Sequence, residues 1–486
     1  MFILKNSKLI FATVSGLLLG FSLIHPWLWP LVFVGTVFTF YIVANSDTAK
    51  EAFKYGWVIG TFKILVSLIW FWSTYPMDWL GLKPGLLQIL LVSLYWVPAG
   101  LTLGLGLGIA AWIYKKYCHH LSTPKLFLVV PLLWVAAEIS GAVIFSIYTL
   151  GPGSYLTLGF SFGQTGYALV SIGLFRYVAI VGGVYLMSFF VALGALSVFI
   201  LKRKTNLLLV AILTVLIIFV PVPKNNMNEA GTQVALIETS FPPNTKTASV
   251  PLFDRQQAYN DLVRYALVSE SDVIILPEDS RFTGFFVNEE QVFSFISSIT
   301  DRDVILIDSM RVEEEGKTVL RAYIYDTSNN TRYEFDKQYL VPQGEYIPWV
   351  YQGLIALLGP QDFTHKAVTD TVYEPGINQS DINLPKNIPP VLFCFESVTP
   401  FGVFKANRDT APFVAHLVSH GWFKREPQIL WHQLDAMLRT QALFNRVPIV
   451  QSANLAPAKI YWPDGSTEFP KIIAESGYWK LYQVQL

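Results

Sequence analysis

The chain has 486 residues, of which 52% are hydrophobic and only 14% are charged, and its mean hydropathy is +0.42. Soluble globular proteins carry about 25% charged residues, so this composition excludes an ordinary soluble protein. The formal net charge of zero combines +9 in residues 1–222 with −9 in residues 223–486, and no basic run indicates nucleic-acid binding.

The first half contains apolar segments long enough to cross a bilayer, since one span takes about 20 apolar residues. We predict seven spans, at residues 9–25, 27–44, 55–73, 84–114, 126–145, 176–201 and 206–222. Lysines and arginines concentrate in alternate connections, so the positive-inside rule places the N-terminus in the cytoplasm. Seven crossings then place residue 223 onward on the outer face of the membrane.

Two features stand out inside these apolar segments. Gly100, Gly104 and Gly108 form a row with a spacing of four residues, which favours close packing of helices. Lys63 and Glu138 are ionisable groups within spans, and such groups are functional candidates. Lys63 has the alternative of extending its ammonium to the membrane surface, whereas the side chain of Glu138 is too short to reach far.

Beyond residue 222, short apolar runs alternate with mixed, charged segments. We predict strands at 234–237, 273–276, 304–307, 321–325, 391–395, 413–418 and 448–450. We predict helices at 255–268, 290–299 and 428–444. This alternation is typical of an α/β domain with sheets covered by helices. The sequence therefore predicts a membrane domain at 1–222 and an α/β domain at 223–486, the latter large enough for a complete core.

Three places in the second domain carry groups suited to catalysis. Glu278 follows a buried strand, Lys337 precedes Glu345 by eight residues, and Cys394 ends an apolar run. Each has an ordinary alternative when taken alone: a solvated strand-end acid, a surface ion pair and a small buried hydrophobic residue. The spacing and order of the three groups along the chain favour a shared catalytic function over these ordinary alternatives.

Strand-Pro-Glu, then Lys with Glu eight residues on, then strand-Cys-x-Glu resembles the Glu–Lys–Cys triad of the nitrilase superfamily. With seven spans in front, the chain resembles bacterial apolipoprotein N-acyltransferases. The resemblance covers nearly the whole chain: the spans, the 151–164 loop, the 337–348 block, 394–396 and 422–423, and weakly Arg439 and Asn454. This resemblance implies that the second domain is an α-β-β-α sandwich on the outer face of the bacterial cytoplasmic membrane.

The resemblance also implies roles for individual residues. Cys394 would be the nucleophile, Glu278 the general base, and Lys337 the cation that stabilises the thiolate and the oxyanion. Supporting and substrate-binding roles fall to Glu345, which orients Lys337 and the incoming amine, and to Glu396, Phe395 and Trp422. The acyl donor implied is a phospholipid, in particular phosphatidylethanolamine, and the acceptor is the α-amine of a diacylglyceryl-cysteine lipoprotein. The chemistry implied needs neither a metal nor an organic cofactor.

The chain departs from the family pattern in several places. It stops at Leu486 on a polar segment where the family usually continues into an eighth span. Residues 237–247 lack the usual Gln-Gly-Asn and a later Trp, and residues 418–421 and 454–456 replace other family motifs. Two alternatives therefore stay open: a membrane-anchored amidase in which water attacks the thioester, and a non-catalytic relative that binds lipid or lipoprotein.

Three histidines, His416, His420 and His432, raise the question of a metal site, since the first two are four residues apart. In a helix, that spacing brings two ligands close together on one face. Because 413–418 is predicted to be a strand, the sequence disfavours a zinc site.

Overall fold

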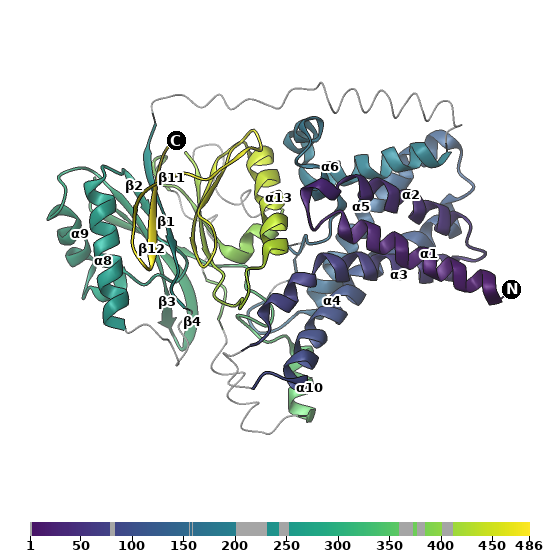
Figure 1. Ribbon diagram of the computed structural model, residues 1–486, viewed down its shortest axis with the longest axis horizontal. Helices are drawn as coiled ribbons and strands as arrows, with labels where there is room; N and C mark the ends of the chain where they lie inside the picture. The colour runs from purple at the N-terminus through teal and green to yellow at the C-terminus, as the bar shows by residue number, and fades with distance from the viewer. Residues whose placement is uncertain are drawn as a thin grey trace.

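The computed structural model describes residues 2–77, 83–154, 156–157, 159–200, 231–242, 252–358, 373–376, 384–400 and 412–486. A helical half and an α/β domain lie side by side along the longest axis of the molecule (Figure 1). The predicted seventh span and the predicted domain boundary at residue 222 lie outside the described residues.

The helical half contains six long helices among the residues described. They are α1 (Phe2–Phe21), α2 (Pro30–Ala44), α3 (Ala49–Ser67), α4 (Leu86–Ile113), α5 (Thr123–Tyr148) and α6 (Gly173–Ile200). Four helical runs, Ala49–Thr74, Leu86–Cys118, Thr123–Tyr148 and Gly173–Ile200, are long and apolar enough to cross a membrane. The apolar helices that match the first two predicted spans are shorter; at about 1.5 Å per residue, α2 extends only about 22 Å.

The predicted glycine row lies at a close contact between α3 and α4. A Cβ atom on Gly104 would lie 2.5 Å from the backbone nitrogen of Thr61, and one on Gly60 would lie 2.5 Å from the carbonyl oxygen of Gly104. Neither position leaves room for a larger side chain. The structure therefore confirms the prediction that these glycines allow close packing of helices.

The α/β domain is built on twelve strands among the described residues. They are β1 (Gln233–Thr239), β2 (Val273–Ile275), β3 (Ile305–Glu314), β4 (Lys317–Asp326), β5 (Thr331–Asp336), β6 (Val391–Phe393), β7 (Val414–Ser419), β8 (Ile449–Asn454), β9 (Lys459–Tyr461), β10 (Thr467–Glu468), β11 (Lys471–Glu475) and β12 (Trp479–Gln485). Hydrogen bonding gives two runs, β11-β12-β1-β2-β3-β4-β5 and β6-β7-β8-β9-β10. The runs join where the end of β1 pairs with the end of β8.

The two runs of strands pack face to face. One buried cluster contains Leu236 and Ile275 from the first run together with Phe393 and Leu417 from the second. The outer face of the first run is covered by α8 (Leu252–Val268) and α9 (Glu289–Ser297), and that of the second by α13 (Gln428–Asn445). The predicted α-β-β-α sandwich is confirmed.

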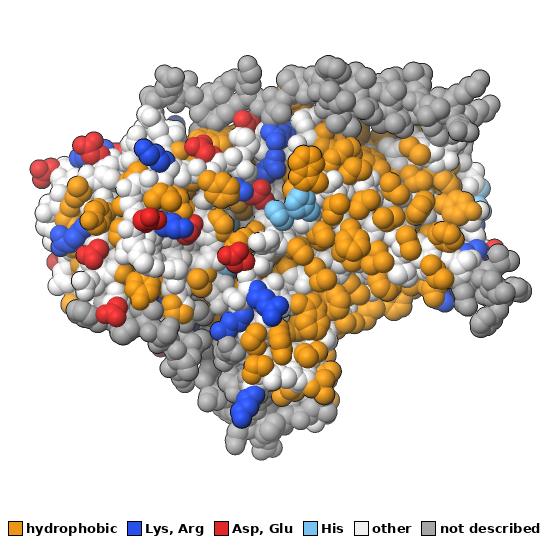
Figure 2. All heavy atoms as spheres, viewed as in Figure 1, with side chains coloured by type: hydrophobic (Ala, Val, Ile, Leu, Met, Phe, Trp, Pro, Cys, Tyr) orange, Lys and Arg blue, Asp and Glu red, His pale blue; other side chains and the backbone are white. Residues whose placement is uncertain are grey.

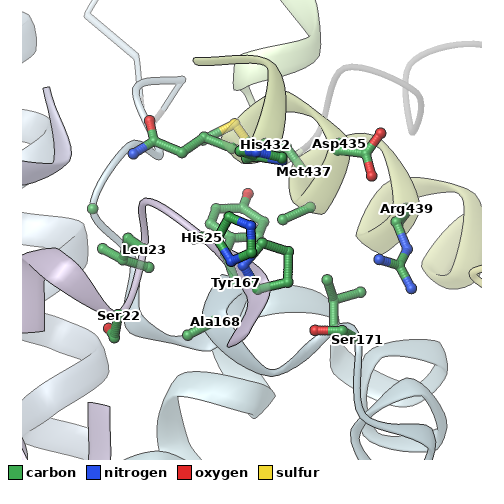
Figure 3. Close-up of a pocket in the computed structure, with 15 residues that line it drawn as sticks. Ser22, Leu23, His25, Tyr167, Ala168, Ser171, His432, Asp435, Met437 and Arg439 are labelled. Carbon is green, nitrogen blue, oxygen red and sulfur yellow. The ribbon is translucent and has the colours of Figure 1, made fainter. Parts of the chain in front are cut away.

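The helical half and the α/β domain meet along α13. Its Leu438 and Ala442 face the strands, whereas Met437 and Leu443 belong to the hydrophobic core of the helical half. The face shown in Figure 2 is covered by hydrophobic side chains over the helices and carries mixed charges over the α/β domain. A pocket of about 500 Å³ lies at this junction, where His25 of the α1–α2 turn faces α13 (Figure 3).

Candidate active site

Glu278 lies just beyond the carboxyl end of β2, where Leu276 still donates a backbone hydrogen bond to Ile307. Its side chain is 8% exposed. One carboxylate oxygen, Oε1, lies 2.9 Å from Lys337 Nζ, and the other, Oε2, accepts a 3.0 Å hydrogen bond from the backbone amide of Ser419. The carboxylate predicted from the strand end is therefore buried and held from two sides.

Lys337 follows β5 directly, and its side chain is 1% exposed. Besides Glu278, its ammonium contacts Oε1 of Glu345 at 2.6 Å. The other oxygen of Glu345 accepts a hydrogen bond from the amide of Val341 at 2.8 Å, which fixes the loop between them. An ammonium has three N–H donors, so two carboxylates leave one donor for a third group.

Cys394 begins a short 3₁₀-helix (Cys394–Val398) immediately after β6. The thiol is half-buried against an apolar cluster that includes Val418, Ala453 and Trp431. The predicted strand 391–395 is therefore wrong at its end, because the chain turns at Cys394 and presents the thiol at the carboxyl end of the sheet.

The charges of this cluster oppose one another. Burial raises the pKa of Glu278 to about 7, although the ammonium of Lys337 acts to lower it. Burial alone would lower the pKa of Lys337, but the carboxylates of Glu278 and Glu345 outweigh it and raise that pKa well above its usual value. Burial and the carboxylate of Glu278 raise the pKa of the Cys394 thiol, whereas Lys337 lowers it. The resting arrangement is thus a neutral thiol beside a cation and a carboxylate whose pKa is close to neutral pH.

Glu396 joins the turn of Cys394 to the loop of Lys337. One of its oxygens accepts from the amides of Gln338 and Tyr339 at 2.8 and 3.3 Å, and the other accepts from the amide of Phe393 at 2.9 Å. The neighbouring Phe395 lines a cavity of about 520 Å³ and lies with its ring centroid 6.3 Å from that of Phe160. Trp422, predicted to bind substrate, is half-buried in the turn after β7.

Two groups at the site were not predicted from sequence. The backbone amide of Ser419 binds Glu278 and also acts to lower the pKa of Cys394. The ring of His416, which is 1% exposed, lies with Nε2 3.4 Å from the carbonyl oxygen of Cys394 and Nδ1 3.0 Å from Gln451 Oε1. Both lie on β7, the strand beside the one that leads to Cys394, but their residue types did not reveal these contacts.

Comparison with known proteins finds one group of similar sequences. Residues 15–197 match the family profile described as "Apolipoprotein N-acyltransferase N-terminal domain". The apolipoprotein N-acyltransferase of Geobacter metallireducens is 26% identical over 471 residues, covering 91% of this chain and 83% of the relative, and that of Rickettsia prowazekii is 24% identical over 465 residues, covering 90% and 85%. The chain is thus similar to apolipoprotein N-acyltransferases over most of its length. Among solved structures, an amidase from Nesterenkonia sp. aligns over 53% of this chain and 92% of its own, with 15% identity and a TM-score of 0.34.

Two weaker matches to the apolipoprotein N-acyltransferases have structural partners. Asn454 accepts hydrogen bonds from the hydroxyl of Thr239 and the amide of Phe241, which fixes the junction of the two runs of strands. Arg439 donates from Nε to the carbonyl oxygen of Gly465. Residues 243–247 of the altered segment 237–247 lie outside the described residues.

The three histidines lie at different places. His416 is within β7, and His420 follows it with its ring stacked on Trp431. His432 is on α13, with its ring centroid 5.1 Å from that of His25. No group of three or more His, Cys, Asp or Glu side chains suited to a metal ion occurs in the part of the chain that the structure describes.

Proposed function

We propose that the chain transfers an acyl chain from a phospholipid to the N-terminal amine of a diacylglyceryl-cysteine lipoprotein, with a thioester on Cys394 as intermediate. The observation that carries the proposal is the cavity beside Phe395. It is lined by Phe145, Thr149 and Phe160 of the helical half and by Tyr339 and other residues of the α/β domain. An acyl chain that extends from the bilayer through this junction ends next to the buried Glu–Lys–Cys cluster.

The first half-reaction forms the thioester. Glu278 takes the proton of the Cys394 thiol, and the sulfur attacks the ester carbonyl of the phospholipid. The free donor of Lys337 stabilises the oxyanion of the tetrahedral intermediate, an effect worth several kcal/mol for one well-placed donor. When the carbon–oxygen bond of the ester breaks, Glu278 returns the proton to the leaving oxygen, and a lysophospholipid departs.

In the second half-reaction the sulfur of Cys394 is the leaving group, and Glu278 acts again as the base. The neutral α-amine attacks the thioester carbonyl, Glu278 takes a proton from the nitrogen, and the sulfur leaves to be reprotonated. A pKa of about 7 for Glu278 suits a group that takes and gives a proton within one cycle. Both oxygens of Glu345 have partners, which supports a role in orienting Lys337 beside the incoming amine.

The placement in the membrane supports the same reaction. The four long apolar helices and the family relationship indicate a bacterial membrane protein. We propose that it lies in the cytoplasmic membrane with residues 1–222 as the membrane domain and residues 223–486 on the outer face. Donor and acceptor are then both anchored in the leaflet that borders the site, and phosphatidylethanolamine is the donor we propose.

The test uses the purified full-length chain in detergent or nanodiscs. The enzyme is loaded with phosphatidylethanolamine carrying a labelled acyl chain, and a synthetic diacylated lipopeptide is then added. We expect the label to appear first on Cys394 by mass spectrometry and then on the N-terminus of the lipopeptide. The matched control is the same lipopeptide with its amine acetylated, which should receive no label.

Two outcomes contradict the proposal. Release of labelled free fatty acid at one rate with and without lipopeptide would identify a hydrolase, in which water attacks the thioester. A chain that acquires no label at Cys394, while retaining its fold, would be the non-catalytic relative. The orientation is tested in whole cells with a variant whose single cysteine is at residue 330. If residues 223–486 lie on the outer face, a thiol reagent should label this cysteine without lysis of the cells.

A further inference from the structure

The ionisable side chains inside the helices form a buried pair that the reaction does not use. Lys63 of α3 and Glu138 of α5 lie with Nζ and Oε1 3.3 Å apart, and their side chains are 7% and 4% exposed. Removing two charges from water costs several kcal/mol per ion before their attraction offsets it. A pair kept at such a cost needs a reason beyond stability.

Glu138 also binds Thr165, in the segment that connects α5 to α6. The same oxygen accepts hydrogen bonds from the backbone amide and the hydroxyl of Thr165, at 2.8 and 2.9 Å. Thr165 begins a 3₁₀-helix (Thr165–Leu169) in a largely non-helical segment, and every residue from 159 to 170 is buried. Backbone groups buried among membrane helices must find partners within the protein, and Glu138 supplies one.

The opposite side of this segment contacts the turn of Cys394. The hydroxyl of Ser161 donates to the carbonyl oxygen of Val398, at the end of that turn. Phe160 lines the cavity beside Phe395, and it also lines the cavity of about 390 Å³ that contains Lys63 and Glu138. Phe160 is thus the wall between the buried ion pair and the site.

We propose that Lys63 and Glu138 are positioning residues that hold segment 159–170 so that Phe160 forms one wall of the acyl side of the Cys394 site. The role of Phe160 beside an acyl chain rests on the proposed function. The contacts by which Lys63 and Glu138 hold segment 159–170, here called the clamp, do not depend on it. Glu138 supplies the acceptor for Thr165, and the ammonium of Lys63 pairs with the same carboxylate oxygen among apolar helices. Gly163 allows the close approach: its φ is +85°, and a Cβ atom there would lie 2.2 Å from Ile64 Cδ1 of α3.

The first experiment measures the clamp by hydrogen exchange with mass spectrometry. The double variant Lys63→Met/Glu138→Leu removes both charges together, so no buried ion is left unpaired. Loss of the charged acceptor should speed exchange in peptides covering 159–170 by about tenfold, with other helices unchanged. Lys63→Arg should preserve protection, and Lys8→Met, which removes an exposed pair with Asp47, is the matched control. Gly163→Ala displaces the segment without a charge change and should also speed exchange.

The second experiment measures the wall. All proteins in this experiment carry Cys118→Ser, so that Cys394 is the thiol that reacts. Cys394 is alkylated with N-ethylmaleimide and with N-dodecylmaleimide. The ratio of the two rates in each variant is compared with the ratio in the protein that keeps Lys63, Glu138 and Gly163. We expect the double variant and Gly163→Ala to keep the N-ethyl rate within about twofold and to change the ratio by about tenfold. Lys63→Arg should keep both.

Three results would overturn the inference: unchanged exchange in 159–170, faster exchange spread equally over all helices, or faster local exchange with an unchanged ratio of alkylation rates. The last would leave the pair a purely structural feature of the helices. If wild-type enzyme fails to acylate lipopeptide while both readouts respond as expected, the proposed function is wrong and the positioning role stands.

Discussion

Replacing Lys337 by Met tests the electrostatics of the site most directly. The substitution keeps an unbranched apolar stem and removes the ammonium that lies 2.9 Å from Glu278 and 2.6 Å from Glu345. All three side chains are less than a tenth exposed. The variant therefore leaves two neighbouring carboxyl groups buried without their cation.

The magnitude follows from the burial. Removing one partner of a buried ion pair destabilises a protein by about 3–5 kcal/mol, because the remaining charge is uncompensated. In the variant, Glu278 relieves this cost by protonation, because burial without the opposing ammonium raises its pKa further above the unfolded value of about 4.3. A carboxyl with a raised folded-state pKa destabilises the folded protein increasingly as pH rises from that unfolded value. The stability difference between wild type and Lys337→Met should thus be smallest near pH 5 and grow toward pH 8.

The assay is unfolding of the purified protein in detergent at pH 5 and pH 8. Lys317→Met is the matched control, because Lys317 pairs with Glu374 at 2.7 Å on the surface, where loss of the pair should change the stability far less. Adding Glu278→Gln and Glu345→Gln to Lys337→Met should restore stability without restoring acyl transfer. Equal stability of Lys337→Met and wild type at pH 8, or a loss independent of pH, would refute the charge balance described for this site.

Three further predictions concern single groups. Cys394→Ala should lower label transfer at least about 10³-fold with unchanged thermal stability; more than a tenth of the activity remaining would exclude a covalent mechanism. Since Glu278 with a pKa of about 7 must be unprotonated to act as base, kcat/KM should rise with pH and reach half its plateau near pH 7, and Glu278→Gln should abolish that rise. Glu396→Leu leaves three backbone amides without their acceptor and should destabilise the fold by about 2–4 kcal/mol in chemical denaturation, with Glu396→Gln losing less; equal losses would contradict the role of its charge.

The positions of the candidate site residues were predictable because these residues follow strands. Glu278 follows β2 after Leu276 and Pro277, and Cys394 comes directly after β6. The apolar runs of both strands are buried and easily recognised in the sequence. All seven predicted strands and the three predicted helices of the α/β domain occur in the structure. Five antiparallel strands, β5 and β9 to β12, were missed. The strands β9 and β10 are short and β11 is mostly exposed, whereas β5 and β12 mix polar with apolar residues, so none has a continuous apolar run.

Other features have no signal in a single sequence. The amide that binds Glu278 is a backbone group, so the identity of Ser419 does not reveal it. Lys63 and Glu138 were each recognisable as ionisable residues in apolar segments, but 75 residues separate them, and their pairing depends on how α3 packs against α5. The helix α10 (Trp349–Leu358) was missed, although it packs on the helical half through a 2.9 Å contact between the hydroxyls of Tyr351 and Tyr148.

The turn that carries Cys394 is held by both halves of the chain. From the α/β domain, Glu396 fixes it to the loop of Lys337; from the helical half, Ser161 contacts Val398 and Phe160 packs near Phe395. A nucleophile on a soluble domain alone would have its far side open to water, which competes with an amine for a thioester. Segment 159–170 of the helical half covers one side of this turn, where Phe160 packs near Phe395. The fusion of the two halves therefore gives the proposed transfer both access to lipid and protection of the intermediate from hydrolysis.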